Sequence, residues 1–328
     1  MIKVAVNGIG TIGKRVAHAV RLQKDMKLVA VSTRSPSPVI RTVLEPSGPL
    51  YRTDLYACDK EHYEKMKEAG MIVNGTLEDL LASGEVEVII DATPGGIGEK
   101  NKPLYEKYKV KAIFEGGEKA SVAEVSFNAL ANYEKALNKN YVRVVSCNTT
   151  SLARTIWCID SHFKVKEVYA CLVRRAADPW EEKKGPINSI VPSLKLPSHH
   201  APDLQTVLPH IKIFSNAVKV PTTLAHVHML QVEVANKVSR EDVISAFNKT
   251  TRILLFRGEE GYTSTSRIIE KFRDLCRPRY DMYEVGIWEE TIFTQNNKIY
   301  WTHMVHQEAI VVPENIDAIR AMFGEEDK

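Results

Sequence analysis

A cysteine at the junction of a predicted strand and a predicted helix is the side chain here best placed to do chemistry. Residues 141–145 form an apolar, β-branched run that predicts a buried strand, and Cys147 follows it closely. Apolar residues then recur at helical spacing, so we expect a helix to begin near Thr149. The N–H groups and positive dipole of a helix N-terminus stabilise a thiolate, which is the nucleophilic form of cysteine. The alternative is a small apolar core residue, since buried unreactive cysteines are common.

Two histidines on another predicted strand supply a candidate base. Residues 220–234 read as one long strand, and period-two alternation places His226 and His228 on the same face. A histidine suits proton transfer at a substrate held by a thiol because its pKa lies near neutral pH. We expect one of the two histidines to act on the substrate and the other to be structural.

A glycine-rich turn near the N-terminus predicts a dinucleotide site. Residues 2–6 form a β-branched strand, Gly8, Gly10 and Gly13 follow in a GxGxxG pattern, and an amphipathic helix comes next. The first glycine permits a tight turn, the second lets a pyrophosphate approach the backbone, and the third lets the helix pack on the strand. The pyrophosphate would rest on the helix N-terminus. The alternative is a purely structural glycine turn.

The end of the second predicted strand bears on the choice of cofactor. In NAD-specific sites an acidic residue usually follows this strand and binds the ribose 2′-hydroxyl. Here residues 28–32 are followed by Thr33, Arg34 and Ser35, and Arg34 is suited to pair with a 2′-phosphate. NADP, or the use of both NADP and NAD, is therefore favoured; otherwise Arg34 is only a solvated charge.

The order of the elements that position these residues predicts an α/β fold with two domains. Over residues 1–146 strands alternate with helices, which predicts a Rossmann-type, doubly wound parallel sheet with helices on both faces. Residues 147–312 combine strands, proline-rich loops and a few helices, which indicates an α+β catalytic domain with a mainly antiparallel sheet. Residues 313–328 begin with Pro313 and predict a last helix that packs back on the nucleotide-binding domain.

Composition narrows the class of protein. The 328-residue chain carries 44 Lys and Arg against 41 Asp and Glu, so its net charge gives no reason to expect nucleic acid or an anionic membrane as a partner. Its five cysteines are scattered without a CxxC pair, so we expect neither a disulfide framework nor a metal site. No run approaches the roughly 18–20 apolar residues of a spanning helix, and no leader precedes the first strand. We therefore expect a soluble, cytoplasmic protein.

Several stretches together resemble one family of enzymes. They are VNGIGTIGKR (6–15), DATPGGIG (91–98), GGEK (116–119), SCNTT (146–150), VRRAADP (173–179), PSHHAPD (197–203) and VPTT (220–223). In this order they resemble the archaeal-type phosphorylating glyceraldehyde-3-phosphate dehydrogenases, essentially from end to end. The resemblance implies a homotetramer of glycolysis or gluconeogenesis that reversibly oxidises and phosphorylates glyceraldehyde 3-phosphate to 1,3-bisphosphoglycerate with NADP or NAD.

The resemblance also implies roles for particular residues. Cys147 matches the nucleophile and His226 the general base, with His228 as the second choice. The thiolate would attack the aldehyde, the base would take the hydroxyl proton as hydride leaves, and inorganic phosphate would then attack the thioester. With the glycine motif and Arg34 included, the full set of expected cofactor contacts is Gly8, Gly10, Thr11, Ile12, Gly13, Arg34, Gly117, Arg175 and Gln307. The expected contacts to substrate and phosphate are Ser146, Asn148, Thr149, Arg174, His199 and His200.

The chain departs from the family pattern at three places, and two other readings stay open. Ser151 stands where relatives often have Gly, Glu115 where Gln is usual, and residues 32–39 differ from the common pattern, which bears on cofactor preference. The first alternative is another thiol-dependent semialdehyde dehydrogenase, which would need an arginine for a carboxylate. The second is a non-catalytic dinucleotide-binding redox sensor. Arg174 with Arg175, and His199 with His200, also remain open to a reading as solvated surface.

Overall fold

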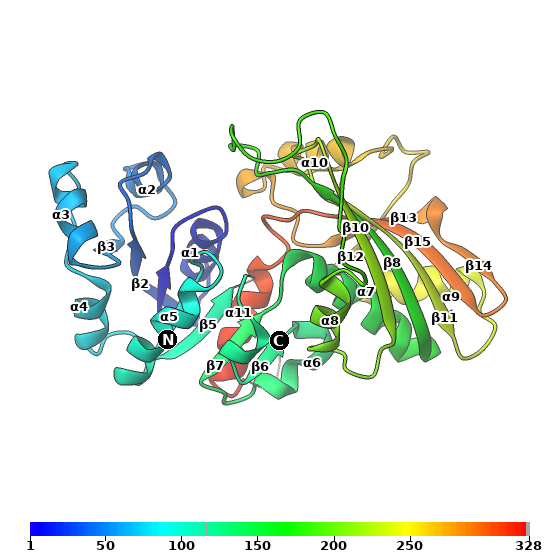
Figure 1. The fold of residues 1–328 in the computed structure, drawn as a ribbon, viewed down its shortest axis with the longest axis horizontal. Coiled ribbons are helices and arrows are strands. Elements are labelled where there is room, and N and C mark those ends of the chain that lie inside the picture. The colour runs from blue at the N-terminus through cyan, green and yellow to red at the C-terminus, as the bar shows by residue number, and fades with distance from the viewer. Residues whose placement is uncertain (116, 326–328) are drawn as a thin grey trace. The chain divides into compact units, whose positions relative to one another are not determined.

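The chain divides into two compact units. The computed structural model describes residues 1–115 and 117–325. One unit comprises Met1–Ser146 and the C-terminal stretch from Val312, and the other comprises Cys147–Val311 (Figure 1). Gly116, part of the expected GGEK cofactor turn, and residues 326–328, the end of the expected last helix, lie outside the described residues.

The first unit is built on a seven-stranded sheet in which every pair of neighbours is parallel. Alternate residues of the central strand are all buried: Ala5 packs in one cluster, while Val4 and Val6 point to the opposite face and are fully buried as well. Both faces are therefore covered, and the predicted doubly wound fold is confirmed. In spatial order the strands are β3 (Asp54–Ala57), β2 (Met26–Thr33), β1 (Ile2–Asn7), β4 (Val88–Asp91), β5 (Lys111–Glu115), β7 (Tyr141–Val144) and β6 (Val125–Phe127).

The helices of this unit follow the strands along the chain. Thr76 is the N-cap of α4 and forms a capping box, because its hydroxyl accepts from the Asp79 N–H while the Asp79 carboxylate accepts from the Thr76 N–H. The last helix, α11, packs on α1 and against β5 and β7. The helices are α1 (Gly13–Arg21), α2 (Pro38–Leu44), α3 (Lys60–Glu68), α4 (Leu77–Ala82), α5 (Ile97–Lys107), α6 (Ala129–Asn132) and α11 (Val312–Met322), with 3₁₀ turns η1 (Ala120–Val122) and η2 (Tyr133–Ala136).

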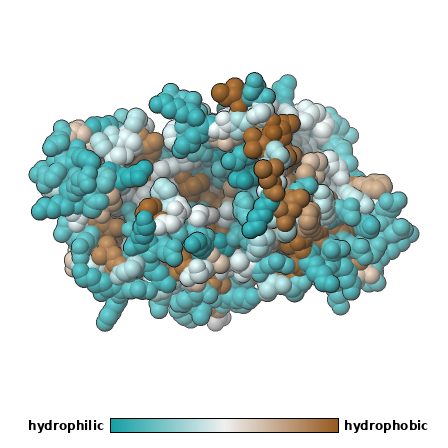
Figure 2. Space-filling view, viewed as in Figure 1, coloured by the Kyte–Doolittle hydropathy of each residue, from teal (hydrophilic) through white to brown (hydrophobic). Residues whose placement is uncertain are grey.

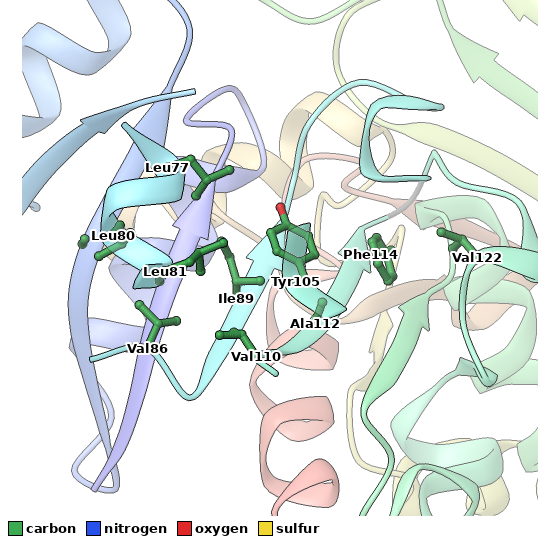
Figure 3. Packing of buried hydrophobic residues seen from close by; sticks show 12 residues of the cluster. Leu77, Leu80, Leu81, Val86, Ile89, Tyr105, Val110, Ala112, Phe114 and Val122 are labelled. Atoms are coloured by element: carbon green, nitrogen blue, oxygen red, sulfur yellow. The ribbon is translucent and has the colours of Figure 1, made fainter. Parts of the chain in front are cut away.

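One cluster of buried side chains ties α4 and α5 to the sheet (Figure 3). Leu77, Leu80 and Leu81 from α4 meet Ile89 of β4 and Tyr105 of α5. Burying a Leu or Ile side chain stabilises a fold by about 1.5–3 kcal/mol, so this cluster holds α4 and α5 against the sheet.

The second unit is a mixed sheet with helices. Its central pairs β8–β11 and β11–β15 are antiparallel, as expected, while β8–β10 and β12–β13 are parallel. In spatial order the strands are β12 (Ile253–Phe256), β13 (Val285–Trp288), β15 (Lys298–Val305), β11 (His226–Val234), β8 (Val165–Arg175), β10 (Ile213–Val220) and β9 (Val191–Pro192), and β14 (Phe293–Gln295) pairs with β15. The helices are α7 (Cys147–Phe163), α8 (His200–Gln205), α9 (Arg240–Lys249) and α10 (Thr265–Asp274), with 3₁₀ turns η3 (Pro278–Tyr280) and η4 (Glu289–Thr291).

The expected strand at residues 220–234 was too long. The run 220–234 is divided between the end of β10 and β11, because Pro221 lacks an N–H and Ala225 adopts a φ of +70°. Within β11, His226 and His228 nevertheless share the buried face, as alternation predicted. No helix among the described residues is long and apolar enough to cross a bilayer.

Glu115, which departs from the family pattern, is buried at the end of β5. Its carboxyl oxygen accepts a 2.6 Å hydrogen bond from the side-chain amide of Asn315 on α11. Burial raises the pKa of Glu115 from 4.5 to about 8, so this carboxyl is protonated at neutral pH. A protonated carboxyl has the shape of the glutamine amide usual at this position, which explains how the site accepts Glu.

The Glu115→Gln variant should change how stability depends on pH. In the wild type the folded state holds a proton between pH 4.5 and about 8 that the unfolded state has lost, so the free energy of unfolding falls as pH rises through this window. The slope from this group is at most about 1.4 kcal/mol per pH unit. Denaturant unfolding at a series of pH values should show this fall in the wild type and in the exposed control Glu68→Gln, and not in Glu115→Gln. The same slope in all three proteins would contradict the assignment.

Candidate active site

Cys147 lies where a strand gives way to a helix. Strand β7 ends at Val144, and α7 begins at Cys147 itself, two residues earlier than the expected start at Thr149. The side chain is partly exposed, in contrast to the fully buried Cys158 on the same helix. A partly accessible sulfur in the first turn of a 17-residue helix lies in the positive end of the helix dipole, where a thiolate is stabilised.

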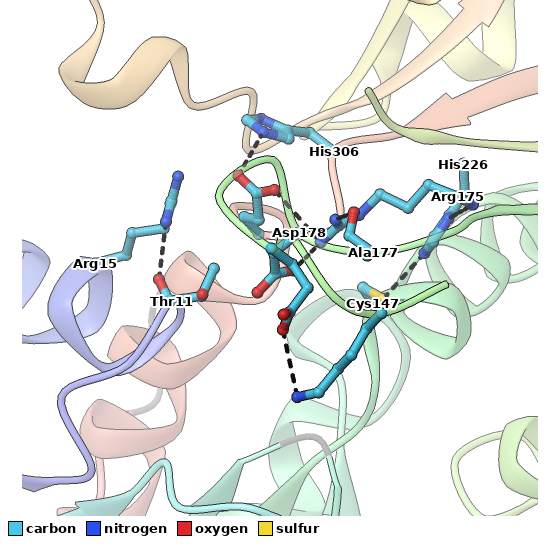
Figure 4. Close-up of polar contacts among 11 residues, drawn as sticks. Thr11, Arg15, Cys147, Arg175, Ala177, Asp178, His226 and His306 are labelled. Atoms are coloured by element: carbon cyan, nitrogen blue, oxygen red, sulfur yellow. Dashed lines mark hydrogen bonds and ion pairs between the residues drawn. The ribbon is translucent and has the colours of Figure 1, made fainter. Parts of the chain in front are cut away.

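The sulfur of Cys147 faces His226. Its Sγ lies 3.8 Å from Nε2 of this histidine, which β11 holds fully inside the unit (Figure 4). His228 does not face the sulfur, because its ring nitrogens lie 2.9 Å from Oδ1 of Asn148 and 3.0 Å from Nε2 of His303. Of the two expected candidates, the geometry therefore pairs His226 with the cysteine.

A backbone hydrogen bond determines which nitrogen of His226 carries the proton. The N–H of Arg175 donates to Nδ1 at 2.9 Å, so Nδ1 is an acceptor and the neutral ring carries its hydrogen on Nε2. Burial, together with the charges of Arg175 and Arg174, holds the pKa of His226 well below its usual range, which keeps the ring neutral. The nitrogen that faces Cys147 is therefore a hydrogen-bond donor.

Arg174, His199 and His200 form a basic group on the same unit. The two histidine rings lie 3.9 Å apart, and the charge of Arg174 contributes to lowering the pKa of both. Burial is the first cause in each case, and it lowers the pKa of His200 to about 3. Nε of Arg174 and Nε2 of His200 are buried and have no hydrogen-bond partner among the described residues. The terminal guanidinium nitrogens of Arg174 are not among these sealed atoms and make no hydrogen bond to the described residues, so they are suited to bind an anion.

Arg175 differs from its neighbour Arg174. Its guanidinium bonds the carbonyl of Ala177 and the carboxylate of Asp178, and it lies 3.3 Å from the carboxylate of Glu308 (Figure 4). Its side chain is about 2% exposed. Arg175 is thus largely neutralised within the protein, and its backbone N–H is the group that contacts the candidate catalytic histidine.

The other expected substrate residues lie at the start of α7. Asn148 and Thr149 are buried there, and the hydroxyl of Thr149 donates to the carboxylate of Asp203 on α8. Ser146 is the last residue before the helix. Ser151, on the next turn, donates to the carbonyl of Asn148 at 2.8 Å and also lies 3.2 Å from Nδ1 of His228.

The glycine turn of the first unit has the shape that a dinucleotide requires. Gly8 adopts a φ of +93°, and a Cβ on Gly13 would lie 1.9 Å from the Gly8 carbonyl, so helix and turn are in direct contact. A Cβ on Gly10 would meet no described atom within 4 Å, which leaves space beside the backbone. Ile12 occupies the N-cap of α1 without a side-chain cap, so the helix N–H groups there are suited to a pyrophosphate. The side chain of Arg15 donates to the carbonyl of Thr11 at 2.8 Å (Figure 4).

Three further expected cofactor residues belong to different elements. Arg34 is exposed directly after β2. Gly117 follows β5, and its backbone lies against Gly95, since a Cβ on Gly95 would come within 2.6 Å of the Gly117 carbonyl. Gln307, half-buried after β15, belongs to the second unit.

Cys58, Asp59 and His62 form a compact group that the sequence reasoning did not identify. Their donor atoms lie within 4.8 Å of one another, a spacing compatible with a metal ion. Asp59 is the N-cap of α3, where it accepts from the backbone N–H and ring of His62. Because the positive end of a helix dipole repels a cation, helix capping accounts for this group.

Sequence reasoning also missed the partners that lie behind the site. On β15, His303 contacts His228 and Trp301 contacts His303, and Glu308 lies beside Arg175. His303 is the direct cross-strand neighbour of His228 in the β11–β15 register. Alternation places His303 on one face of its strand, but nothing in a single sequence states which strands pair.

Comparison with known proteins determines the family. A model described as "Glyceraldehyde 3-phosphate dehydrogenase, C-terminal domain" matches residues 146–275, and one described as "Dihydrodipicolinate reductase, N-terminus" matches residues 2–126. The glyceraldehyde-3-phosphate dehydrogenases of Pyrococcus abyssi and Thermococcus sibiricus are each 54% identical over 327 residues, covering 100% of this chain and 95% of the relative. That of Thermoplasma volcanium is 49% identical over 328 residues, with the same coverage.

The chain belongs to the glyceraldehyde-3-phosphate dehydrogenase family. The expected resemblance is therefore confirmed over the whole chain, and with it the expectation of an oxidoreductase that has a nucleotide-binding domain. Within this family member, the residues paired at the candidate site are Cys147 and His226.

Replacing each of the two histidines of β11 tests which one acts on the substrate. His226→Ala removes the N–H that faces the sulfur, and kcat should fall about 10²–10³-fold, the loss typical of a donor to a developing oxyanion. His228→Ala should lower kcat less, because His228 contacts Asn148 and not the sulfur. Steady-state kinetics of both variants, with their thermal unfolding as a control for folding, measures the difference. A larger loss in His228→Ala would show that the catalytic histidine has been misassigned.

Proposed function

We propose that this chain catalyses the reversible, phosphorylating oxidation of glyceraldehyde 3-phosphate to 1,3-bisphosphoglycerate, with NADP or NAD as the hydride acceptor. The observation that carries the proposal is the pairing of Cys147 with His226, 3.8 Å apart, on the unit that holds the basic group Arg174, His199 and His200. A thiol–imidazole pair supports acyl transfer, and the basic group supports anionic substrates. Membership of the family supports the same reaction.

The residues of the chain account for the steps at the substrate carbon. The thiolate of Cys147 adds to the aldehyde carbon, which forms a C–S bond and leaves the negative charge on oxygen. Hydride then leaves the same carbon and the carbonyl is restored as a thioester; a bound nicotinamide supplies the hydride acceptor. An oxygen of inorganic phosphate attacks the thioester carbon, and the thiolate departs with the electrons of the C–S bond, which yields the acyl phosphate.

His226 acts in this scheme as a hydrogen-bond donor. The sequence alone suggested that it takes up a hydroxyl proton. With its hydrogen on Nε2, the neutral ring is instead suited to donate to the alkoxide oxygen, from which hydride departs without a base. A donor aimed at a developing oxyanion lowers the barrier by roughly 3–4 kcal/mol in comparable enzymes.

The two arginines take different parts in the proposal. Arg174 binds phosphate, since its terminal guanidinium nitrogens make no hydrogen bond to the described residues and its neighbours are His199 and His200. Arg175 positions His226 through its backbone N–H, since Asp178 and Glu308 already engage its guanidinium.

The first unit is suited to hold the cofactor. Gly8, Gly10 and Gly13 leave backbone and helix N–H groups for the pyrophosphate, with Thr11 and Ile12 in the same turn. Arg34 follows β2 where an NAD-specific site has an acid, so it is placed to accept the 2′-phosphate of NADP while NAD is tolerated.

The proposal also includes the assembly of this protein into a homotetramer in the cytoplasm. Apolar side chains gather on the face of the second unit seen in Figure 2, over strands of the mixed sheet and the loop that precedes α8. On neighbouring strands of the sheet, the exposed side chains of Tyr169 and Phe214 stack with ring centroids 5.7 Å apart, and Met229 of the next strand is also exposed. Exposed apolar patches of this kind mark contacts between subunits, so a second copy of the chain is the proposed occupant.

An assay of nicotinamide reduction separates the proposed function from its alternatives. Glyceraldehyde 3-phosphate should be oxidised rapidly only when phosphate or arsenate is present, whereas aspartate semialdehyde and N-acetylglutamate semialdehyde should be poor substrates. Cys147→Ser should abolish turnover and retain NADP binding in a fluorescence titration, because the dinucleotide site lies in the other unit. A preference for a carboxylated semialdehyde, or binding without any turnover, would favour one of the two alternatives.

Arg34→Ala should shift the preference between the cofactors. Loss of the guanidinium should raise the KM for NADP about tenfold or more, since a charge-assisted hydrogen bond to phosphate contributes about 1.5–3 kcal/mol. The KM for NAD should stay nearly constant, because NAD has no 2′-phosphate. Arg267→Ala, an exposed arginine on α10 of the other unit, serves as the matched control. If the NADP and NAD constants rise together, Arg34 does not contact the 2′-phosphate.

A further inference from the structure

A buried chain of hydrogen bonds runs from β15 through β11 to the residue after the nucleophile. Nε1 of Trp301 lies 3.0 Å from Nδ1 of His303, and Nε2 of His303 lies 3.0 Å from Nδ1 of His228. Nε2 of His228 lies 2.9 Å from Oδ1 of Asn148. All four side chains are at most 3% exposed and belong to one unit.

The chemistry of the Trp301 indole determines which group donates in each of these hydrogen bonds. An indole N–H is a donor only, so Nδ1 of His303 is an acceptor, and the neutral ring carries its hydrogen on Nε2. That N–H donates to Nδ1 of His228, which therefore also carries its hydrogen on Nε2. His228 in turn donates to the side chain of Asn148, so the atom that it contacts is the amide oxygen and not the amide nitrogen.

Burial keeps the rings of His303 and His228 in the neutral form that these donor and acceptor roles require. It lowers the pKa of His303 to about 3, and it lowers that of His228 well below its usual range, with the neighbouring His303 as the second cause. Protonation of either ring would set two N–H groups against each other. The series of hydrogen bonds therefore has a single set of donors and acceptors at physiological pH.

The amide nitrogen of Asn148 is left to face a ligand. Within the described part of the chain no hydrogen bond is made by this nitrogen, and it does not occur among the sealed polar atoms that lack a partner. It therefore adjoins space that water or substrate enters, on the residue directly after Cys147. An amide whose oxygen is bound from behind presents its N–H groups to the front.

We propose that Trp301, His303 and His228 are positioning residues that lock the Asn148 amide, and that its Nδ2–H donates to the oxygen of the carbon attacked by Cys147. The inference deepens the proposed function and rests on it. Asn148 and the Nε2–H of His226 then bind one oxyanion from two sides, each held from behind by a group that only donates: the Trp301 indole for one and the Arg175 N–H for the other. Rigid donors of this kind need no reorganisation as charge develops.

The Trp301→Phe variant removes the donor at the start of the chain while keeping an aromatic ring against Phe247. The His303 ring is then free to adopt the other tautomer, and the Asn148 amide loses its fixed orientation. The expected loss is about three- to tenfold in kcat, the range of coupling within a hydrogen-bonded network, with little change in KM. Trp288→Phe is the matched control, since it also removes an indole hydrogen bond, a partly buried one to the carbonyl of Tyr262 on the same unit, and should leave kcat unchanged.

A double-mutant cycle separates positioning from a general loss of stability. Asn148→Ala should lower kcat about 10²–10³-fold by removing the donor itself. Trp301→Phe should then have no further effect on kcat in the Asn148→Ala background, although its effect on thermal unfolding should persist. His228→Gln, which keeps an N–H for the Asn148 oxygen, should retain more activity than His228→Leu.

Each other outcome overturns a distinct claim. An equal kcat loss from Trp301→Phe in both backgrounds, or an equal loss in Trp288→Phe, would show that Trp301 acts only through stability. Unchanged kcat in Asn148→Ala would show that the amide does not bind the oxyanion. In either case the wild type still oxidises glyceraldehyde 3-phosphate with phosphate; a wild type without that activity would instead overturn the proposed function.

Discussion

The hydrogen bond from the backbone of Arg175 to the ring of His226 is the constraint on which the candidate site depends. Strand β8 ends at Arg175, and there its N–H is donated to an imidazole instead of a strand carbonyl. This bond makes Nδ1 an acceptor, so the nitrogen that faces Cys147 carries the hydrogen. Without it, the ring has two tautomers of similar stability, and the group opposite the sulfur is undefined.

The three central strands of the mixed sheet orient both histidines of β11. Strand β11 lies between β8 and β15, so one neighbour orients His226 and the other orients His228. The rings of His226 and His228 are nearly parallel, with centroids 6.4 Å apart, yet they face Cys147 and Asn148 respectively. Cys147 and Asn148, which are adjacent at the start of α7, are thus contacted by two histidines of one strand, and different partners orient the two rings. Burial of both rings keeps them neutral, which suits donors and excludes proton acceptors at Nε2.

Local patterns in the sequence were sufficient for the fold class, the glycine turn and the shared face of His226 and His228. Each depends on neighbours within a few residues along the chain. The split at Pro221, the different surroundings of Arg174 and Arg175, and the contact of His303 with His228 depend on which distant segments meet. Such contacts are set by which strands pair, and the local periodicity of a single sequence does not say which strands pair.

The buried carboxyl at Glu115 has a consequence for the charge of the whole molecule. Counting every acid as ionised gives a formal net charge of +3 at pH 7. Because the pKa of Glu115 is about 8, this acid carries a proton at that pH and the count becomes +4. Electrophoretic mobility and isoelectric position therefore report the folded state, and on denaturation the protein acquires one additional negative charge and releases a proton to the buffer.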